Sequence, residues 1–173
     1  MASEIGSIVI DCRSMEDIQI FRNFYNEYMG KHSEYHEDVN EDDISHTSFE
    51  NMSDDYSFEI DDICSLFDDP MDTPLFDLVK QFILKNPDVE FDLTYEMAWD
   101  NSGETWSEEY NYSEHVLRME TVFDPDYPDD DYDDEDEDED EEEDDDDFGE
   151  PSDSAQVTNR TFEYNGTELV EKK

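Results

Sequence analysis

His32 and His36 are the residues whose spacing comes nearest to a metal site, because they lie four positions apart among Glu34, Glu37 and Asp38. On a helix, this spacing would put both imidazoles on one face, where they could bind a single zinc ion. The surrounding segment, however, lacks the apolar periodicity of a packed helix. Acids beside the histidines add little information, because the chain contains 56 Asp and Glu residues. We therefore interpret both histidines as solvated side chains of a charged loop and predict no metal site.

The other histidines and the two cysteines give no catalytic signature. His46 and His115 are isolated in the sequence, and a histidine–carboxylate pair needs a positioned substrate pocket to act in acid–base catalysis. Cys12 and Cys64 are too few for a disulfide framework and are typical of buried thiols in a reducing compartment. The chain contains no glycine-rich phosphate loop and no HExxH, GxSxG, CxxC or EF-hand pattern. We therefore predict a protein that is not an enzyme and needs no cofactor.

The chemistry that the sequence does offer is that of a polyanion. Between Asp129 and Asp147, every residue except Tyr132 is acidic. An extended chain advances ~3.3 Å per residue, and one strand of a nucleic-acid duplex carries a phosphate every ~3.4 Å. The run therefore has about the linear charge density of one nucleic-acid strand. Mutual repulsion and the lack of apolar side chains predict that the run is disordered, so it would attract divalent cations only as loosely held counterions.

The negative charge extends well beyond this run. The 173-residue chain has a formal net charge of −47, and residues 1–123 alone contain 31 acids and six bases, a net charge of −25. Such a surface repels nucleic acid and anionic membranes, and it attracts basic proteins or proteins whose natural ligand is a polyanion. A run that served only to keep the protein soluble is the alternative. It does not account for the acids of the folded part.

Neither a secretory signal nor a membrane span is predicted. Residues 1–13 contain no basic region followed by a long apolar stretch. No window approaches the ~20 apolar residues that a transmembrane helix requires. We therefore expect a cytoplasmic protein without a membrane partner.

The first elements that could position these charges are a strand and a helix. Residues 7–13 form a short β-branched segment that predicts a strand, and Ser14 is suited to cap the helix that follows. Gly30 is a plausible end for this helix. Its apolar stripe consists of Ile18, Phe21, Phe24 or Tyr25, and Tyr28.

The middle of the chain gives one clear helix. Residues 31–55 are polar and acidic and predict a loop or a poorly ordered insertion, whereas the alternation in 56–60 favours a strand. Ile63, Leu66 and Phe67, which follow, could equally form a short helical turn. A second helix begins at Thr73–Pro74, since proline is tolerated in the first helical turn, and ends at Asn86–Pro87. Its buried stripe consists of Leu75, Leu78 or Val79, Phe82 and Ile83.

The last third of the chain predicts two antiparallel hairpins. Residues 89–99 alternate regularly, with Val89, Phe91, Leu93, Tyr95, Met97 and Trp99 on one side. A turn at 100–103 leads to a second alternating segment with Trp106, Tyr110 and Tyr112 on one side, and a strand follows at 116–123. A final hairpin over 161–170 turns at Asn165-Gly166. This dipeptide favours a type I′ turn, whose two central residues both need positive φ.

This order of elements predicts an α+β protein with a small antiparallel sheet and two helices on one face. A ferredoxin-like arrangement is one candidate. We expect an acidic domain over 1–123, a disordered acidic segment over 124–157, and a C-terminal hairpin over 158–173 that is added to the domain. The second face of the sheet would then be exposed to solvent and rich in Asp, Glu and Tyr.

We expect this exposed face and the acidic run to bind a basic protein partner. The fixed array on the sheet is predicted to consist of Glu90, Asp92, Glu96, Glu108 and Glu114, together with Glu109. Tyr110 and Tyr112 could either anchor the partner, as aromatic residues do at interfaces, or belong to the core, where we place Trp99. The acids of the run are Asp129, Asp130, Asp131, Asp133, Asp134, Glu135, Asp136, Glu137, Asp138, Glu139, Asp140, Glu141, Glu142, Glu143, Asp144, Asp145, Asp146 and Asp147.

In size, charge and aromatic content, the chain resembles the acidic DNA-mimic inhibitors of phages and mobile elements, of the anti-restriction and anti-CRISPR type. The resemblance lies in overall character and not in a motif. It implies a non-catalytic protein in the host cytoplasm that blocks the DNA- or RNA-binding surface of a host defence enzyme or another nucleic-acid enzyme. Carboxylates would replace phosphates, so binding should weaken steeply with salt. The alternatives are an immunity protein or antitoxin for a basic toxin, and an acidic chaperone of basic proteins such as histones.

Overall fold

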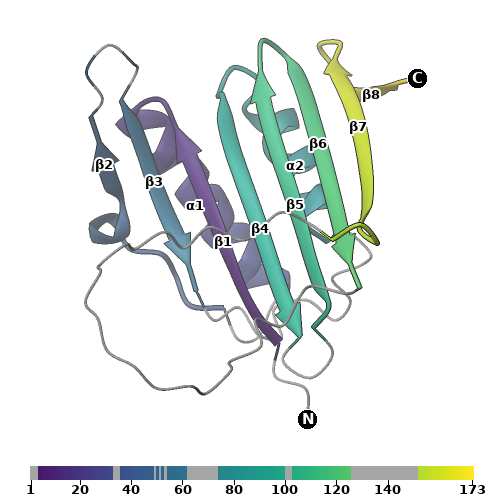
Figure 1. Cartoon of the computed structure of the whole chain (residues 1–173). Coiled ribbons are helices and arrows are strands. Elements are labelled where there is room, and N and C mark those ends of the chain that lie inside the picture. The colour runs from purple at the N-terminus through teal and green to yellow at the C-terminus, as the bar shows by residue number, and fades with distance from the viewer. Residues whose placement is uncertain are drawn as a thin grey trace, which may run out of the picture.

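The computed structural model describes residues 4–32, 36–48, 50, 52, 54–61, 74–99, 103–125 and 152–173. In these ranges, the chain forms an eight-stranded antiparallel sheet and two α-helices (Figure 1). The strands lie in the order β2-β3-β1-β4-β5-β6-β7-β8. The predicted α+β class is therefore confirmed. The sheet is larger than we expected, and the ferredoxin-like arrangement is not confirmed.

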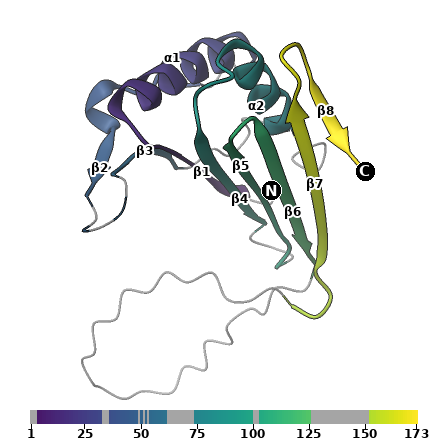
Figure 2. The ribbon, with the colours of Figure 1, turned by 90° about the horizontal axis from the view of Figure 1, so that it is seen from above.

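The strands and helices have the following bounds. They are β1 (Glu4–Cys12), α1 (Met15–His32), the short 3-10 helix η1 (Glu41–Asp43), β2 (Ser45–Thr47), β3 (Asp55–Ile60), α2 (Pro74–Lys85), β4 (Phe91–Trp99), β5 (Thr105–Ser113), β6 (Val116–Asp124), β7 (Gln156–Tyr164) and β8 (Leu169–Lys172). Both helices lie on the same face of the sheet, as the view from above in Figure 2 shows.

Helix α1 begins where the sequence predicted and ends later. The Ser14 hydroxyl accepts a hydrogen bond of 3.1 Å from the Asp17 amide, which confirms the N-cap. The helix continues through Gly30, so the predicted stop is wrong. Two contacts between residues four apart extend the helix past Gly30: Lys31 pairs with Glu27 at 2.6 Å, and the ring of His32 stacks on Tyr28 at 4.2 Å.

Part of the segment that we expected to be a loop or insertion is tied to α1. The backbone amide of Val39 donates to the Asn26 side chain at 2.9 Å, and its carbonyl accepts from Asn26 and Arg22. Val39 is buried, and η1 and the edge strand β2 follow it. This contact was not predicted, because one apolar residue and three side-chain hydrogen bonds create no periodic pattern in the sequence.

The core lies between the helices and the sheet and is rich in aromatic rings. Phe21 of α1 contacts Phe82 of α2 at 4.1 Å and Phe91 of β4 at 4.9 Å, measured between ring centroids. Both members of each predicted alternative, Phe24 with Tyr25 and Leu78 with Val79, are buried. The core therefore fixes both helices against the same face, and neither helix covers the other face of the sheet.

The C-terminal hairpin extends the sheet through pairing of β7 with β6, from Val116 opposite Glu163 to Phe123 opposite Gln156. The predicted type I′ turn is wrong, because of the two central residues only Gly166 has a positive φ, of 97°. The side chain of Asn165 instead accepts hydrogen bonds from the amides of Thr167 and Glu168, both at 3.0 Å. This makes a four-residue loop held by an asparagine side chain.

Several predictions fall outside the described residues. They concern the turn at 100–102, the segment with Ile63, Leu66 and Phe67, Cys64, and the acidic run 129–147. Within the described ranges, neither helix has the length and apolar character needed to cross a membrane.

Candidate protein-binding face

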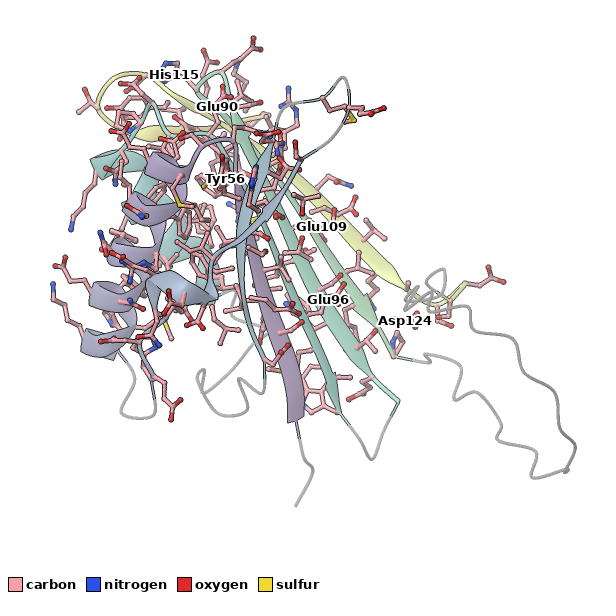
Figure 3. The ribbon with its side chains drawn as sticks, turned by 90° about the vertical axis from the view of Figure 1, so that its left-hand side faces the viewer. Tyr56, Glu90, Glu96, Glu109, His115 and Asp124 are labelled. Atoms are coloured by element: carbon pink, nitrogen blue, oxygen red, sulfur yellow. The ribbon has the colours of Figure 1, made fainter. Side chains whose placement is uncertain are left out.

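The sheet has one face that the helices do not cover, and acidic side chains of five strands project from it. We call it the open face and define it by Asp11 of β1, Glu59 of β3, Asp92 and Glu96 of β4, Glu109 of β5, and Glu120 of β6. Residues next to these in sequence, such as Ile10, Leu93 and Met119, are buried under the helices, because side chains of a strand alternate between the two faces. Figure 3 shows Glu96 and Glu109 on the side away from the helices.

Two pairs of acids lie directly opposite each other on neighbouring strands of the open face. Asp11 of β1 is opposite Asp92 of β4, and Glu109 of β5 is opposite Glu120 of β6. Like charges in this position destabilise a sheet. The folded protein therefore contains repulsion that its own residues do not fully remove.

The pKa values of three acids of the open face are raised, mainly by burial and in smaller part by neighbouring acids. Burial raises the pKa of Glu96, and the charge of Glu109 raises it further. Burial also raises the pKa of Asp11, with additional contributions from Asp55 and Asp92. The pKa of Glu59 is raised by burial and then by Asp61 and Glu96. A cation brought to this face would favour the charged forms of these groups.

One end of the open face is partly neutralised by Arg13. Its guanidinium contacts Asp55 at 2.5 Å and Asp92 at 2.7 Å. Asn111 also donates to Asp92, at 2.5 Å, so the Asp92 carboxylate is held in a fixed position. The acids toward the centre of the face, Glu109 and Glu120, have no ion pair with any residue in the described ranges.

A hollow of about 430 Å³ lies in this central part of the open face. Its lining comes from strands β4 to β7, and the polar residues in it are Asp92, Thr94, Glu109, Tyr110, Asn111, Arg118, Glu120, Asn159, Arg160 and Thr161. The hollow therefore combines carboxylates with neutral hydrogen-bonding groups and with Arg118, whereas the guanidinium of Arg160 lies over the rings of Phe76 and Phe162. Such a mixed surface suits contact with a folded protein better than loose association with ions.

The structure places most of the predicted sheet residues on or beside the open face. Asp92, Glu96 and Glu109 belong to it. Glu90 is exposed just before β4, where it accepts a 3.0 Å hydrogen bond from the amide of Glu114. Glu114 itself lies in the β5–β6 turn and has a positive φ of 51°. The two acids thus sit together at the end of the sheet where β5 turns into β6.

Three predicted site residues lie on the opposite face. Glu108 has no exposure, and Tyr110 and Tyr112 are each 1% exposed, so all three belong to the core under the helices. Placing Glu108 on the exposed face was wrong, and the alternation itself corrects it, because Glu108 has the same parity as Trp106 and Tyr110. Burial raises the pKa of Glu108 to about 8. The Tyr112 hydroxyl donates to the carbonyl of Pro87 at 2.8 Å, which ties β5 to the segment between α2 and β4.

The sequence interpretation missed Asp11, Glu59 and Glu120 as members of the face. Each acid alternates with buried residues, as Asp11 does with Ile10 and Cys12, so period-2 alternation could have found them. What the sequence could not give is the order of strands. That order alone brings Asp11 opposite Asp92.

The surroundings of His36 differ from those that we predicted. His36 is not a solvated side chain: only 4% of it is exposed, and it packs against the ring of Tyr25 at 5.5 Å. His32 is exposed at the end of α1. Within the described part of the chain, no three His, Cys, Asp or Glu residues are grouped as metal ligands.

Comparison with known proteins gave no match to a protein-family model, a curated protein or a solved structure. The geometry and charge of the open face are therefore the features that indicate a function.

Proposed function

We propose that this is a non-catalytic binding protein whose open face mimics the charge of nucleic acid and blocks the nucleic-acid-binding surface of a basic enzyme in the cytoplasm. The observation that carries the proposal is the pairing of like charges across β1–β4 and β5–β6. These pairs oppose folding, and cations supplied by another molecule would relieve them. A host defence enzyme that binds DNA or RNA is the partner class we favour.

The spacing of the sheet supports this use. Neighbouring strands lie about 4.8 Å apart, and residues of one face recur about every 6.8 Å along a strand. A duplex carries a phosphate about every 3.4 Å along each strand. Positions on the open face therefore lie about 1.4 to 2 times as far apart as the phosphates of one strand are spaced along the duplex axis, and the sheet holds their carboxylates in place. A surface whose Lys and Arg side chains bind phosphates would release its counterions to this face instead.

The ends of the acidic segment support a second, long-range role. Ser152 donates to the Asp124 carboxylate through its amide at 2.7 Å and through its hydroxyl at 2.5 Å. The chain therefore leaves β6 and returns to β7 at the same end of the sheet, with residues 126–151 between. We propose that the acids of this segment increase the rate of association through long-range attraction, whereas the open face supplies specificity.

A pull-down with matched variants tests the proposed function. The double variant E109Q/E120Q removes two charges from the open face. The double variant E16Q/E37Q removes two exposed charges from the helix side and serves as the control. Each protein is used as bait in an extract of the source cell at low salt and at roughly 0.5 M salt, where charges are screened beyond about 4 Å.

We expect wild type and the control to capture one nucleic-acid enzyme that both salt and duplex DNA release, and E109Q/E120Q to capture several-fold less. Capture of a single basic toxin would favour an immunity protein, and capture of many histones or ribosomal proteins an acidic chaperone. If salt changes nothing, or if both double variants behave like wild type, the open face is not the binding surface and the proposal fails.

A further inference from the structure

Arg118 differs from the other three arginines of the chain. Arg13 contacts Asp55 and Asp92, Arg22 contacts Glu41, and Arg160 contacts Glu171 through two nitrogen atoms. Arg118 forms no ion pair with any residue of the described ranges, although it belongs to a chain of net charge −47. Its guanidinium is therefore available to another molecule.

Arg118 lies on the open face, close to acids but paired with neutral residues. The residue is exposed on β6, in the hollow of the open face, and its pair with Asn111 lies two residues along the strands from the pair of Glu109 and Glu120. The residues directly opposite it are neutral: Asn111 on β5 and Thr161 on β7. Arg118 thus lies near the like-charged pair Glu109–Glu120 but is not directly opposite either acid.

A cation at this position would weaken binding to a uniformly cationic surface, because like charges brought together at an interface cost affinity. Resting on the function proposed above, we infer that the partner presents a carboxylate opposite Arg118, surrounded by the cations that Glu109, Glu120 and their neighbours bind. Guanidinium and carboxylate form a planar, two-point contact, which would fix the orientation of the complex.

This charge pattern identifies the kind of partner. Carboxylates surrounded by phosphate-binding cations occur where an enzyme holds metal ions against a nucleic acid backbone. The inferred occupant is therefore the active-site cleft of a metal-dependent nucleic-acid enzyme, with Arg118 directed at its metal-binding carboxylates. Arg118 also disfavours binding to a protein surface that consists only of cations, because no carboxylate of such a surface lies opposite it.

Two synthetic peptides of nine residues test the inference. One consists of arginine only, and in the other the central arginine is replaced by aspartate. Their affinities for wild type, R118Q and R118K are measured by titration calorimetry at low salt, and melting curves establish that each variant is folded. Because exposed ion pairs contribute little, the expected changes are modest, roughly twofold to fivefold.

We expect R118Q to bind the all-arginine peptide more tightly and the aspartate peptide more weakly than wild type, and R118K to lie between wild type and R118Q. If R118Q changes both affinities in the same direction and by the same factor, Arg118 does not face a carboxylate and the inference is overturned. The proposed function would then still stand, provided that E109Q/E120Q weakens both peptides. If the wild type binds neither peptide, both the inference and the proposed function fail.

Discussion

Glu108 is a carboxylic acid whose side chain has no exposure to solvent. It lies on β5, between Tyr95 of β4 and Thr121 of β6, and neither of its oxygens has a hydrogen bond of good geometry. A buried carboxylate without partners costs several kcal/mol, so the group is held in its neutral form. Burial accordingly raises its pKa to about 8, and the neighbouring Tyr110 hydroxyl opposes this shift only in part.

Glu108 makes the free energy of unfolding of the protein depend on pH. The pKa of Glu108 is higher in the folded state than the ordinary value of 4.5, so its contribution to stability is complete below pH 4.5 and is lost as the pH rises through about 8. We expect wild type to lose stability between pH 5 and pH 9, at up to about 1.4 kcal/mol per pH unit. Glu108→Gln, which cannot ionise, should flatten this dependence.

Urea unfolding at several pH values measures the effect of Glu108→Gln, and Glu16→Gln serves as the control because Glu16 is exposed on α1, away from the open face. An equal pH dependence in wild type and Glu108→Gln would mean that Glu108 is solvated in the folded protein.

At the scale of elements, α1 and the β7–β8 loop each contain a glycine, and the two differ in their backbone. A Cβ atom added at Gly30 or at Gly166 would meet no atom within 4 Å beyond those of the adjacent residues and of the helix backbone itself. Gly30 lies inside the helix, whereas Gly166 has a φ of 97°, a conformation that residues with a side chain rarely adopt. The effect of an alanine substitution on stability should therefore differ between the two sites only because of their backbone conformations.

We predict that Gly30→Ala stabilises the protein by about 0.5–1 kcal/mol, because alanine loses less conformational entropy than glycine in a helix. Gly166→Ala should destabilise it by about 1 kcal/mol or more, since alanine is strained at positive φ. Urea midpoints of the two variants measure both effects. Equal shifts of the same sign would show that α1 does not continue through Gly30.

The sequence predicted the elements with a regular pattern and missed those without one. Strands β4, β5 and β6 were found because buried and open-face residues alternate along them, as Tyr110 and Tyr112 do with Asn111. Strand β2 was missed because its three residues are all exposed. The start of β7 was missed for the same reason, since residues 156–159 are exposed.

The candidate site was only partly predictable, for a related reason. Alternation assigns each acid to a face, and applying it consistently would have moved Glu108 into the core. It does not say which strands are neighbours. The pairing of β1 with both β3 and β4 depends on how α1 and α2 pack in three dimensions, and it alone brings Asp11 close to Asp55 and Asp92.

For the whole molecule, the net charge of −47 makes stability depend on salt. We predict that the melting temperature at pH 7 rises as sodium chloride is increased from low concentration to roughly 0.5 M, because screening reduces repulsion between acids. The variant E109Q/E120Q should melt a few degrees higher than wild type at low salt and respond less to salt.

Mild acid should act in the same direction as salt. The pKa values of Asp11, Glu59 and Glu96 are raised in the folded state, so the contribution of these groups increases as the pH falls toward their ordinary values. Differential scanning calorimetry over salt and pH measures both effects. A melting temperature that is independent of salt would show that the acids of the open face do not repel one another appreciably.

The contact between Asp124 and Ser152 has a consequence for how such a protein can change over time. Since β6 and β7 are already neighbours and this contact closes the gap between them, the connecting segment is not needed to align the strands. Doubling the length of a flexible loop costs only about 0.6 kcal/mol. Insertions and deletions of acidic codons between Asp124 and Ser152 would therefore change the net charge of the protein without changing the pairing of β6 with β7. In this way the length of the acidic segment and the residues of the open face can evolve independently of each other.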